Sequence, residues 1–205
     1  MLEILYKGGP VMYLLLLCSV FSVTITIERI VFWIGIWTKK NDRVLNMILR
    51  LVEKGKINEA LANCKKTKDH RVAILAEGIK NYKTNFTTAL EAAGANEINL
   101  MKKYLVVLDT IITLSPLLGI LGTVFGVIVS FGIIGQGTEI VDPTAVTGGI
   151  AQALITTAAG LIIAVFTLIP FNCFNSFTEE NAQEIEKYVN ALELAHSSDK
   201  NIEEI

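Results

Sequence analysis

The sequence is poor in charged residues, in cysteine and in histidine. Only 19% of its 205 residues are charged and 52% are hydrophobic, which is too apolar for an ordinary soluble domain. The net charge of −2 offers no basic surface for nucleic acid. Cys18, Cys64 and Cys173 are scattered and form no disulfide framework or metal motif. His70 and His196 stand outside any catalytic or metal-binding motif, and we interpret them as exposed helix side chains.

Long hydrophobic runs are the main feature that is present. A membrane-spanning helix takes about 20 apolar residues, and the segments 11–37, 104–134 and 145–174 are each long enough to form one. The first run has only Lys7 before it and no small-residue cleavage site after its apolar core. We therefore predict that it is a retained transmembrane helix and not a signal peptide.

The distribution of positive charge predicts the orientation. Of the 18 Lys and Arg residues, 14 lie within 38–103, whereas the loop 135–144 has none. Lys and Arg near helix ends favour the cytoplasmic side. We therefore place 38–103 and the tail 175–205 in the cytoplasm, and the segments 1–10 and 135–144 on the opposite side.

Both cytoplasmic segments are predicted to be helical. Apolar residues recur at helical spacing through 38–103, with a break at Gly55, and a last helix begins near Asn85 and continues into the second span. The tail from 178 to 196 is amphipathic, and we interpret it as a rod that projects into the cytosol. The predicted fold is all-α: a polytopic membrane protein with three transmembrane helices and extended cytoplasmic helices.

The second and third spans carry stripes of small and polar residues. Residues three and four apart share one face of a helix. In the second span the stripe consists of Ser115, Gly119, Gly122, Thr123, Gly126 and Ser130. In the third span two adjoining stripes include Gly149, Gln152, Thr156 and Gly160, and Ala153, Thr157 and Ala164. Small residues allow membrane helices to pack closely, so packing alone is one interpretation of these stripes.

The polar members of the stripes favour a second interpretation, an ion pathway. A threonine hydroxyl can bond to its own helix, but the amide of Gln152 needs partners or water at membrane depth. Pro116 also frees a backbone carbonyl one turn earlier. The residues predicted to line the pathway are Thr123, Thr157, Gln152 and Thr156. Those predicted to serve helix packing or pore shape are Pro116, Gly119, Gly122, Gly126 and Gly160.

No carboxylate lies at mid-membrane on these stripes. Asp109 is near the cytoplasmic end of the second span, and Glu139 and Asp142 are in the outer loop. Ion translocation through a dry site normally needs a carboxylate. If ions pass here, the central acid must therefore come from another chain with its own membrane helix. Asp109 is left either as a structural charge or as part of a cytoplasmic ion exit.

Two motifs, "PLLGILGTVFG" and "GIAQALITTAAGL", together with the arrangement of the spans, resemble the MotA/TolQ/ExbB proton-channel family, most closely its ExbB/TolQ branch. The resemblance covers the whole chain. It implies an inner-membrane pentamer around the membrane helices of an ExbD/TolR-type partner, which supplies an aspartate. It also implies ion flow that energises TonB- or Tol-dependent work through a TonB/TolA-type protein, and with an inner-membrane location the charge distribution makes the N-terminus periplasmic and the C-terminus cytoplasmic.

The resemblance also assigns roles to single residues. By motif, Thr123 and Thr157 fall on pore-facing threonines of the family, and Gln152 falls where many ExbB members have a glutamate. The glutamine removes a titratable group, which leaves either H⁺ or Na⁺ as the coupling ion. No organic cofactor, metal or catalytic residue is implied.

Other classes of function predict different patterns. A non-conducting membrane scaffold that recruits a single-span partner would tolerate apolar residues at Thr123 and Gln152. An intramembrane enzyme would need a Ser/His, His/Glu or Asp pair in the spans, and the sequence has none. A solute transporter would need more spans or an inverted repeat.

Overall fold

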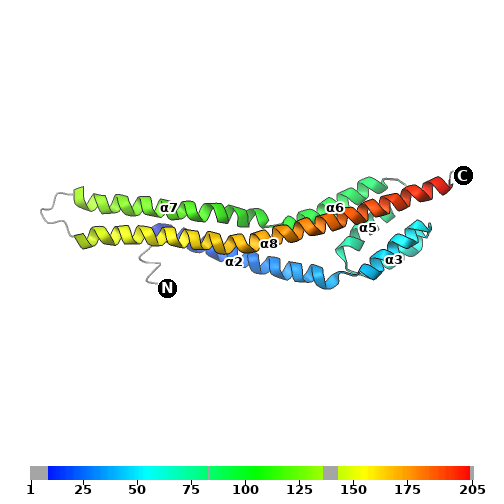
Figure 1. The fold of residues 1–205 in the computed structure, drawn as a ribbon, viewed down its shortest axis with the longest axis horizontal. Coiled ribbons are helices and arrows are strands. Elements are labelled where there is room, and N and C mark those ends of the chain that lie inside the picture. The colour runs from blue at the N-terminus through cyan, green and yellow to red at the C-terminus, as the bar shows by residue number, and fades with distance from the viewer. Residues whose placement is uncertain (1–8, 83, 136–142, 204–205) are drawn as a thin grey trace. The chain divides into compact units, whose positions relative to one another are not determined.

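The computed structural model describes residues 9–82, 84–135 and 143–203, and the regular elements in these ranges are all α-helices, as Figure 1 shows. They are α2 (Gly9–Lys39), α3 (Asp42–Glu53), α4 (Ile57–Cys64), α5 (His70–Lys80), α6 (Phe86–Lys102), α7 (Leu105–Gly135) and α8 (Pro143–Glu203). The all-α prediction is confirmed for these residues. Of the segments 1–10 and 135–144, which are predicted to lie outside the membrane, residues 1–8 and 136–142 fall outside the described residues.

Three of the helices are long and apolar enough to cross a membrane: α2, α7 and α8. In the most apolar window of each, only 22% of the residues are buried inside the chain. Most of the apolar side chains therefore face outward, where lipid or another chain would have to cover them.

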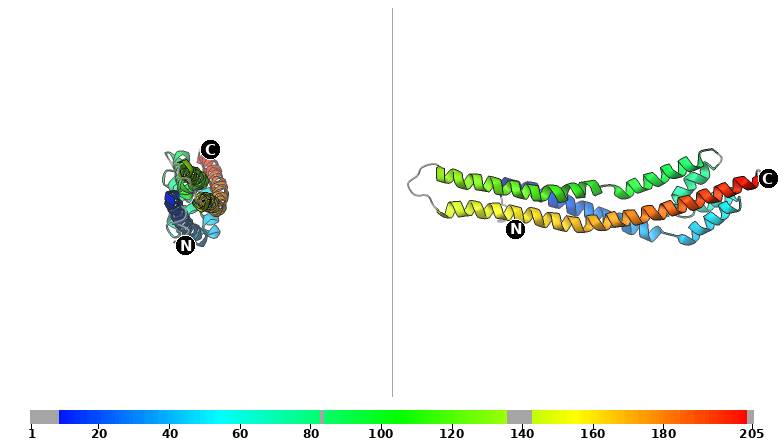
Figure 2. Two further views of the ribbon diagram at one scale, coloured as in Figure 1. Left: turned by 90° about the vertical axis from the view of Figure 1, so that its left-hand side faces the viewer. Right: turned by 45° about the horizontal axis from the view of Figure 1, so that its top comes forward.

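The chain divides into two compact units, and the first combines the described residues up to Glu28 with Tyr104–Phe174. Within it, α7 and the first half of α8 lie side by side and antiparallel (Figures 1 and 2). The start of α2 joins this pair through a buried hydrogen bond, in which the hydroxyl oxygens of Ser22 and Thr167 lie 2.6 Å apart.

The second unit comprises Arg29–Lys103 and the chain from Asn175 onward. Its core draws on the helices α3 to α6 and on the ends of α2 and α8. Fully or almost fully buried members are Trp33, Leu45, Ile48, Ile74, Leu75, Leu90, Met101, Ile185 and Leu192. The end of α8 is therefore a packed part of this unit, with the apolar side of the predicted amphipathic helix turned into its core.

Two of the breaks between helices bear on the sequence predictions. The first comes after α3, where Gly55 has φ of +68°, and it lies where the sequence predicts it. The second shows that the predicted continuation of the last cytoplasmic helix into the second span is wrong. The helix α6 ends at Lys102 and α7 begins at Leu105, because Tyr104 adopts a left-handed φ of +66° that cannot continue a right-handed helix.

Candidate functional site

The site that the sequence predicts lies along the contact between α7 and α8, which we call the α7–α8 seam. At the glycines of this seam the two backbones approach each other closely. A Cβ atom on Gly119 would lie 2.9 Å from the Cα atom of Thr157, and one on Gly126 would lie 2.7 Å from the Cβ atom of Ala153. Real Cβ contacts of this length hardly occur. Only glycine fits at these two positions of α7 without a shift of the helices.

The same holds for Gly122 and Gly160. A Cβ atom on Gly122 would collide with the hydroxyl of Thr156, and one on Gly160 would collide with the carbonyl oxygen of Ser115. The four glycines that the sequence singles out therefore all lie in the α7–α8 seam, on both of its sides.

The three threonines of the site are placed differently. Thr157 donates across the seam to the carbonyl oxygen of Gly119, at 2.9 Å. Thr156 is 1% exposed and donates at 2.7 Å to the carbonyl oxygen three residues earlier, so it fills the interior of the seam. Thr123 is half-buried and donates at 2.6 Å to the carbonyl oxygen three residues earlier. Thr123 and Thr157 thus keep part of their surface outside the seam, whereas Thr156 does not.

Gln152 lies in a small cleft of about 160 Å³ within the first unit. The cleft is lined by Pro10, Val11, Gly122, Phe125, Gly126, Val129, Gly149 and Gln152. A Cβ atom on Gly9 would collide with the amide nitrogen of Gln152. The glutamine therefore shares a cleft with three glycines of the seam, Gly122, Gly126 and Gly149, but its amide group rests against the start of α2.

Pro116 and Asp109 lie on α7, the first inside the helix and the second near its start. Pro116 has no N–H to donate to the carbonyl of Ile112, yet α7 remains one helix. The preceding Ser115 is buried and donates to Ile111, at 2.7 Å. Asp109 is exposed in the second turn of α7, away from the seam.

A second polar cleft, between α2 and α8, was missed by sequence reasoning. It measures about 220 Å³ and is lined by Ser19, Ser22, Val23, Thr26, Ile27, Ile163, Phe166 and Thr167. Its hydroxyls on α2, from Ser19, Ser22 and Thr26, recur at spacings of three and four residues. This is the same signal that singles out the stripe of the second span, so the sequence contained it.

The second unit holds a buried ion-pair cluster that sequence reasoning also missed. The guanidinium of Arg71 is 1% exposed and lies 2.7 Å from Asp69, 2.8 Å from Asp42 and 2.5 Å from Glu184. The ammonium of Lys40 lies 2.6 Å from Glu184. The cluster thus ties the end of α2 and the starts of α3 and α5 to α8.

The cluster changes the pKa values of its members. Burial alone would raise the pKa values of Asp69 and Glu184, but the hydrogen bonds and charges of Arg71 and Lys40 outweigh it and lower both. Burial lowers the pKa of His70 to about 4, although the carboxylate of Asp69 opposes the shift. This histidine is therefore neutral at pH 7.

Neither histidine is the exposed side chain that the sequence suggested. The side chain of His70 is only 10% exposed, because it lies beside the cluster. His196 packs against the rings of Tyr82 and Phe86, with each pair of ring centroids 4.3 Å apart. Aromatic packing of this kind holds the end of α8 on the second unit.

Comparison with known proteins shows the family of this chain. Residues 56–187 match the model of the MotA/TolQ/ExbB proton channel family. This range includes the whole of the α7–α8 seam. The chain belongs to this family. The resemblance found in the sequence is thereby confirmed, and the family is one of channel and transport proteins.

Relatives within the family cover most of the chain. A Synechocystis sp. protein named ExbB-like 3 is 36% identical over 92% of this chain and 91% of its own length. An ExbB homolog of Methanothermobacter thermautotrophicus is 27% identical over 90% of this chain and 66% of its own length. The biopolymer transport protein ExbB of Aquifex aeolicus is 36% identical over 48% of this chain and 67% of its own length. With its three apolar helices, this member of the family is a multi-pass membrane protein.

Proposed function

We propose that this protein is the pentameric ion-channel subunit of an inner-membrane motor of the ExbB/TolQ type. Five copies surround the membrane helices of an ExbD/TolR-type single-span partner, and α7 and α8 line the central space. Flow of H⁺ or Na⁺ energises TonB- or Tol-dependent transport or envelope work. The N-terminus is periplasmic and the C-terminus cytoplasmic, in agreement with the Lys- and Arg-rich segment 38–103.

One observation supports this proposal most directly. Thr123 and Thr157 are only half-buried at the α7–α8 seam, in spans that contain no carboxylate between Asp109 and Glu139 or between Asp142 and Glu179. Hydroxyls can assist an ion that passes, but a site without a carboxylate needs a titratable group from elsewhere. A partner helix with an aspartate supplies that group.

The test begins with the protein purified in mild detergent from the membranes of its own cells. Native mass spectrometry should give five times 22.5 kDa plus the mass of a smaller single-span protein. The complex is then placed in liposomes with a pH-sensitive or Na⁺-sensitive dye. Ion flux should need both proteins and should fall in Thr123→Val and Thr157→Val, with Thr157→Ser as the matched control.

The outcomes separate the channel from the scaffold. If the ion flux is unchanged in the two valine variants, Thr123 and Thr157 do not take part in the ion pathway. A complex that assembles but conducts nothing, and works equally well with Thr123→Val and Gln152→Leu, would establish the non-conducting scaffold. Substantial flux from the chain without a partner contradicts the need for a foreign carboxylate.

A further inference from the structure

The cleft between α2 and α8, which we call the α2–α8 cleft, contains two hydroxyl groups that differ from the others in the spans. A hydroxyl in a membrane helix usually donates to a carbonyl oxygen three or four residues earlier. The hydroxyls of the spans that do so include Thr24, Ser115, Thr123, Ser130, Thr156 and Thr167. Ser19 and Thr26 line the cleft, but their hydroxyls have no hydrogen-bond partner among the described residues.

The hydroxyl between these two on α2 is already bonded. Thr167 donates its single proton to the carbonyl oxygen of Ile163 at 2.7 Å. In the 2.6 Å contact between the hydroxyls of Ser22 and Thr167, the donor is therefore Ser22. Among the residues that line the cleft, Ser19 and Thr26 are thus the ones that keep a proton to donate.

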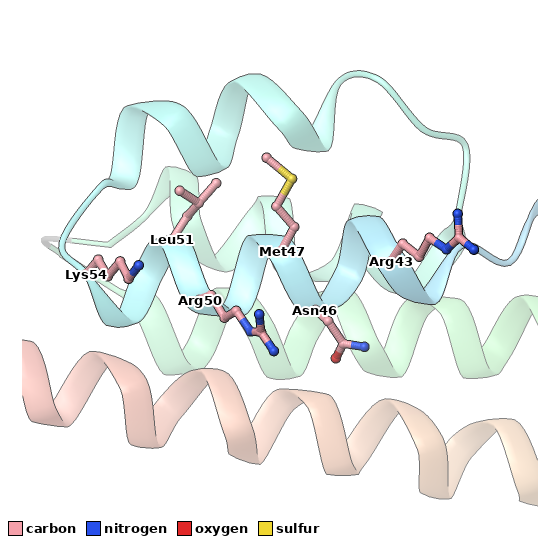
Figure 3. Close-up of a pocket in the computed structure, with 6 residues that line it drawn as sticks. All are labelled: Arg43, Asn46, Met47, Arg50, Leu51 and Lys54. Carbon is pink, nitrogen blue, oxygen red and sulfur yellow. The ribbon is translucent and has the colours of Figure 1, made fainter.

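A free donor has different consequences in water and in a membrane span. Outside the three candidate spans, a shallow depression of about 480 Å³ on α3 is lined by Arg43, Arg50 and Lys54, which are exposed so that water can hydrate them (Figure 3). Ser19 and Thr26 lie on an apolar membrane helix. Lipid chains offer no acceptor there, and an unpaired polar group costs free energy. The cleft therefore needs an acceptor from another polypeptide.

The start of α7 carries a matching acceptor. Asp109 is exposed, and its carboxylate has no ion pair or hydrogen bond within the part of the chain that the structure describes. Thr110 and Thr113 are exposed beside it and donate their protons to carbonyl oxygens of their own helix. These three side chains therefore present acceptors and no free donor. A carboxylate on a membrane helix needs donors or a counter-ion, and the α2–α8 cleft has two donors.

The cleft and the carboxylate lie at the same level of the first unit. Thr157 is bonded to Gly119, and α7 runs antiparallel to the first half of α8 (Figures 1 and 2). Thr167 comes ten residues after Thr157, and Asp109 comes ten residues before Gly119. Both therefore lie about 15 Å from that contact in the same direction. The hydrogen bond from Ser22 to Thr167 brings the middle of the cleft to this level.

We propose that Asp109 of one copy of this chain docks in the α2–α8 cleft of the adjacent copy, where the hydroxyls of Ser19 and Thr26 donate to its carboxylate. This inference rests on the homo-oligomer of the proposed function. Rotation about an axis normal to the membrane keeps every residue at its own level, so the carboxylate meets a neighbour's cleft at the same depth. Each copy offers Asp109 to one neighbour and its cleft to the other, which is the head-to-tail contact that closes a ring.

The test uses two differently tagged full-length copies, expressed together in the protein's own cells. One carries Val23→Cys and the other Thr110→Cys. Val23 lines the cleft and is 56% exposed, and Thr110 is exposed next to the carboxylate. Both substitutions leave Ser19, Thr26 and Asp109 in place. A mild oxidant added to the membranes should give a disulfide-linked dimer with both tags.

The matched control moves the cysteine out of the cleft. Phe21→Cys replaces Val23→Cys, since Phe21 is 58% exposed two residues away on α2 but does not line the cleft. Residues two apart point to different sides of a helix, so no mixed-tag dimer is expected. Copies with only one new cysteine control for Cys18, Cys64 and Cys173.

Substitution of the acceptor tests the chemistry of the contact. Asp109→Leu in the Thr110→Cys copy removes the acceptor, and most of the mixed-tag dimer should be lost. Asp109→Asn keeps an acceptor oxygen and should keep the dimer.

Substitution of the donors should have the same effect from the other side. Ser19→Ala/Thr26→Val in the Val23→Cys copy removes both free donors and should also cause loss of the dimer. Thr24→Val is the control, since the hydroxyl of Thr24 is bonded to Val20 and lies outside the cleft.

The outcomes separate this inference from the proposed function. A pentameric mass without the mixed-tag dimer overturns the inference and leaves the proposed function standing. Equal amounts of dimer with Asp109→Leu and Asp109→Asn also overturn it, because the carboxylate then plays no part in the contact. Loss of ion flux in Asp109→Leu, with no mixed-tag dimer, would instead assign Asp109 to the cytoplasmic ion exit. A mass of 22.5 kDa overturns both proposals.

Discussion

The hydroxyl of Thr157 on α8 donates a hydrogen bond to the carbonyl oxygen of Gly119 on α7, at 2.9 Å. The contact is possible because Gly119 has no side chain to keep the helices apart. A residue that the sequence assigns to ion passage thus also fastens two membrane helices together. Any experiment on Thr157 must separate the two roles.

Thr157→Val should reduce the stability of the protein even without its partner. The change keeps the shape of the side chain but removes the donor, and such bonds between membrane helices are worth about 0.6 to 2 kcal/mol. Thr157→Ser should keep the stability, because it keeps the hydroxyl. Thermal unfolding of both variants in detergent checks this, and equal melting temperatures for valine and serine would contradict it.

Gly122→Ala should separate α7 from α8. The added methyl group would collide with the hydroxyl of Thr156, and such overpacking costs about 1 to 3 kcal/mol. Gly132→Ala on the same helix is the control, since nothing lies within 4 Å of its added Cβ atom. Its effect should be neutral or stabilising by up to about 1 kcal/mol. If both variants lowered the melting temperature by a similar amount, the collision in the seam would not be the cause of the loss in Gly122→Ala.

Arg71→Met should be the most damaging single change in the second unit. It leaves the carboxylates of Asp69 and Glu184 without their main partner, and breaking a buried ion pair costs about 3 to 5 kcal/mol. The exposed Lys56–Glu59 pair provides the contrast. Lys56→Met should cost less than about 1 kcal/mol. Protection of backbone amides in α5 from hydrogen exchange should fall in the first variant only.

Acidification should destabilise the protein through His70 before it protonates Asp69 and Glu184, whose pKa values are lowered by Arg71 and Lys40. The pKa of His70 is about 4 in the folded chain against the ordinary 6.5, so between these values the unfolded chain binds more protons and stability falls as the pH falls. The slope is at most about 1.4 kcal/mol per pH unit for one group. His70→Gln should reduce that slope between pH 6.5 and pH 5, as measured by melting temperature. The same slope in wild type and variant would exclude His70 as the cause.

Features with a local signal could be predicted from the sequence. Runs of apolar residues predict α2, α7 and the first half of α8, because a bilayer of fixed thickness demands that length. The spacing of Gly119, Gly122 and Gly126 predicts a surface of close helix contact, and these glycines do face α8. Gly55 predicts the break that follows α3.

Features that depend on partners far away in the sequence could not be predicted. Arg29 donates at 3.1 Å to the carbonyl oxygen of Leu100, 71 residues away, and Arg71 reaches Glu184 across 113 residues. Nothing near either arginine in the sequence indicates these contacts. His70 was misjudged for the same reason, since its burial results from the cluster around it. The left-handed Tyr104 carries no glycine or asparagine signature that would reveal the break before α7.

The hydrogen bonds of the seam have one further chemical consequence. A hydroxyl group has a single proton, and Thr123 and Thr157 each give theirs to a backbone carbonyl. What they can present to anything beyond the seam is therefore oxygen lone pairs alone. These two hydroxyls can therefore accept from a proton donor or face a cation but cannot donate to an anion, and this one-sided chemistry is set by hydrogen bonds to the backbone of the two helices.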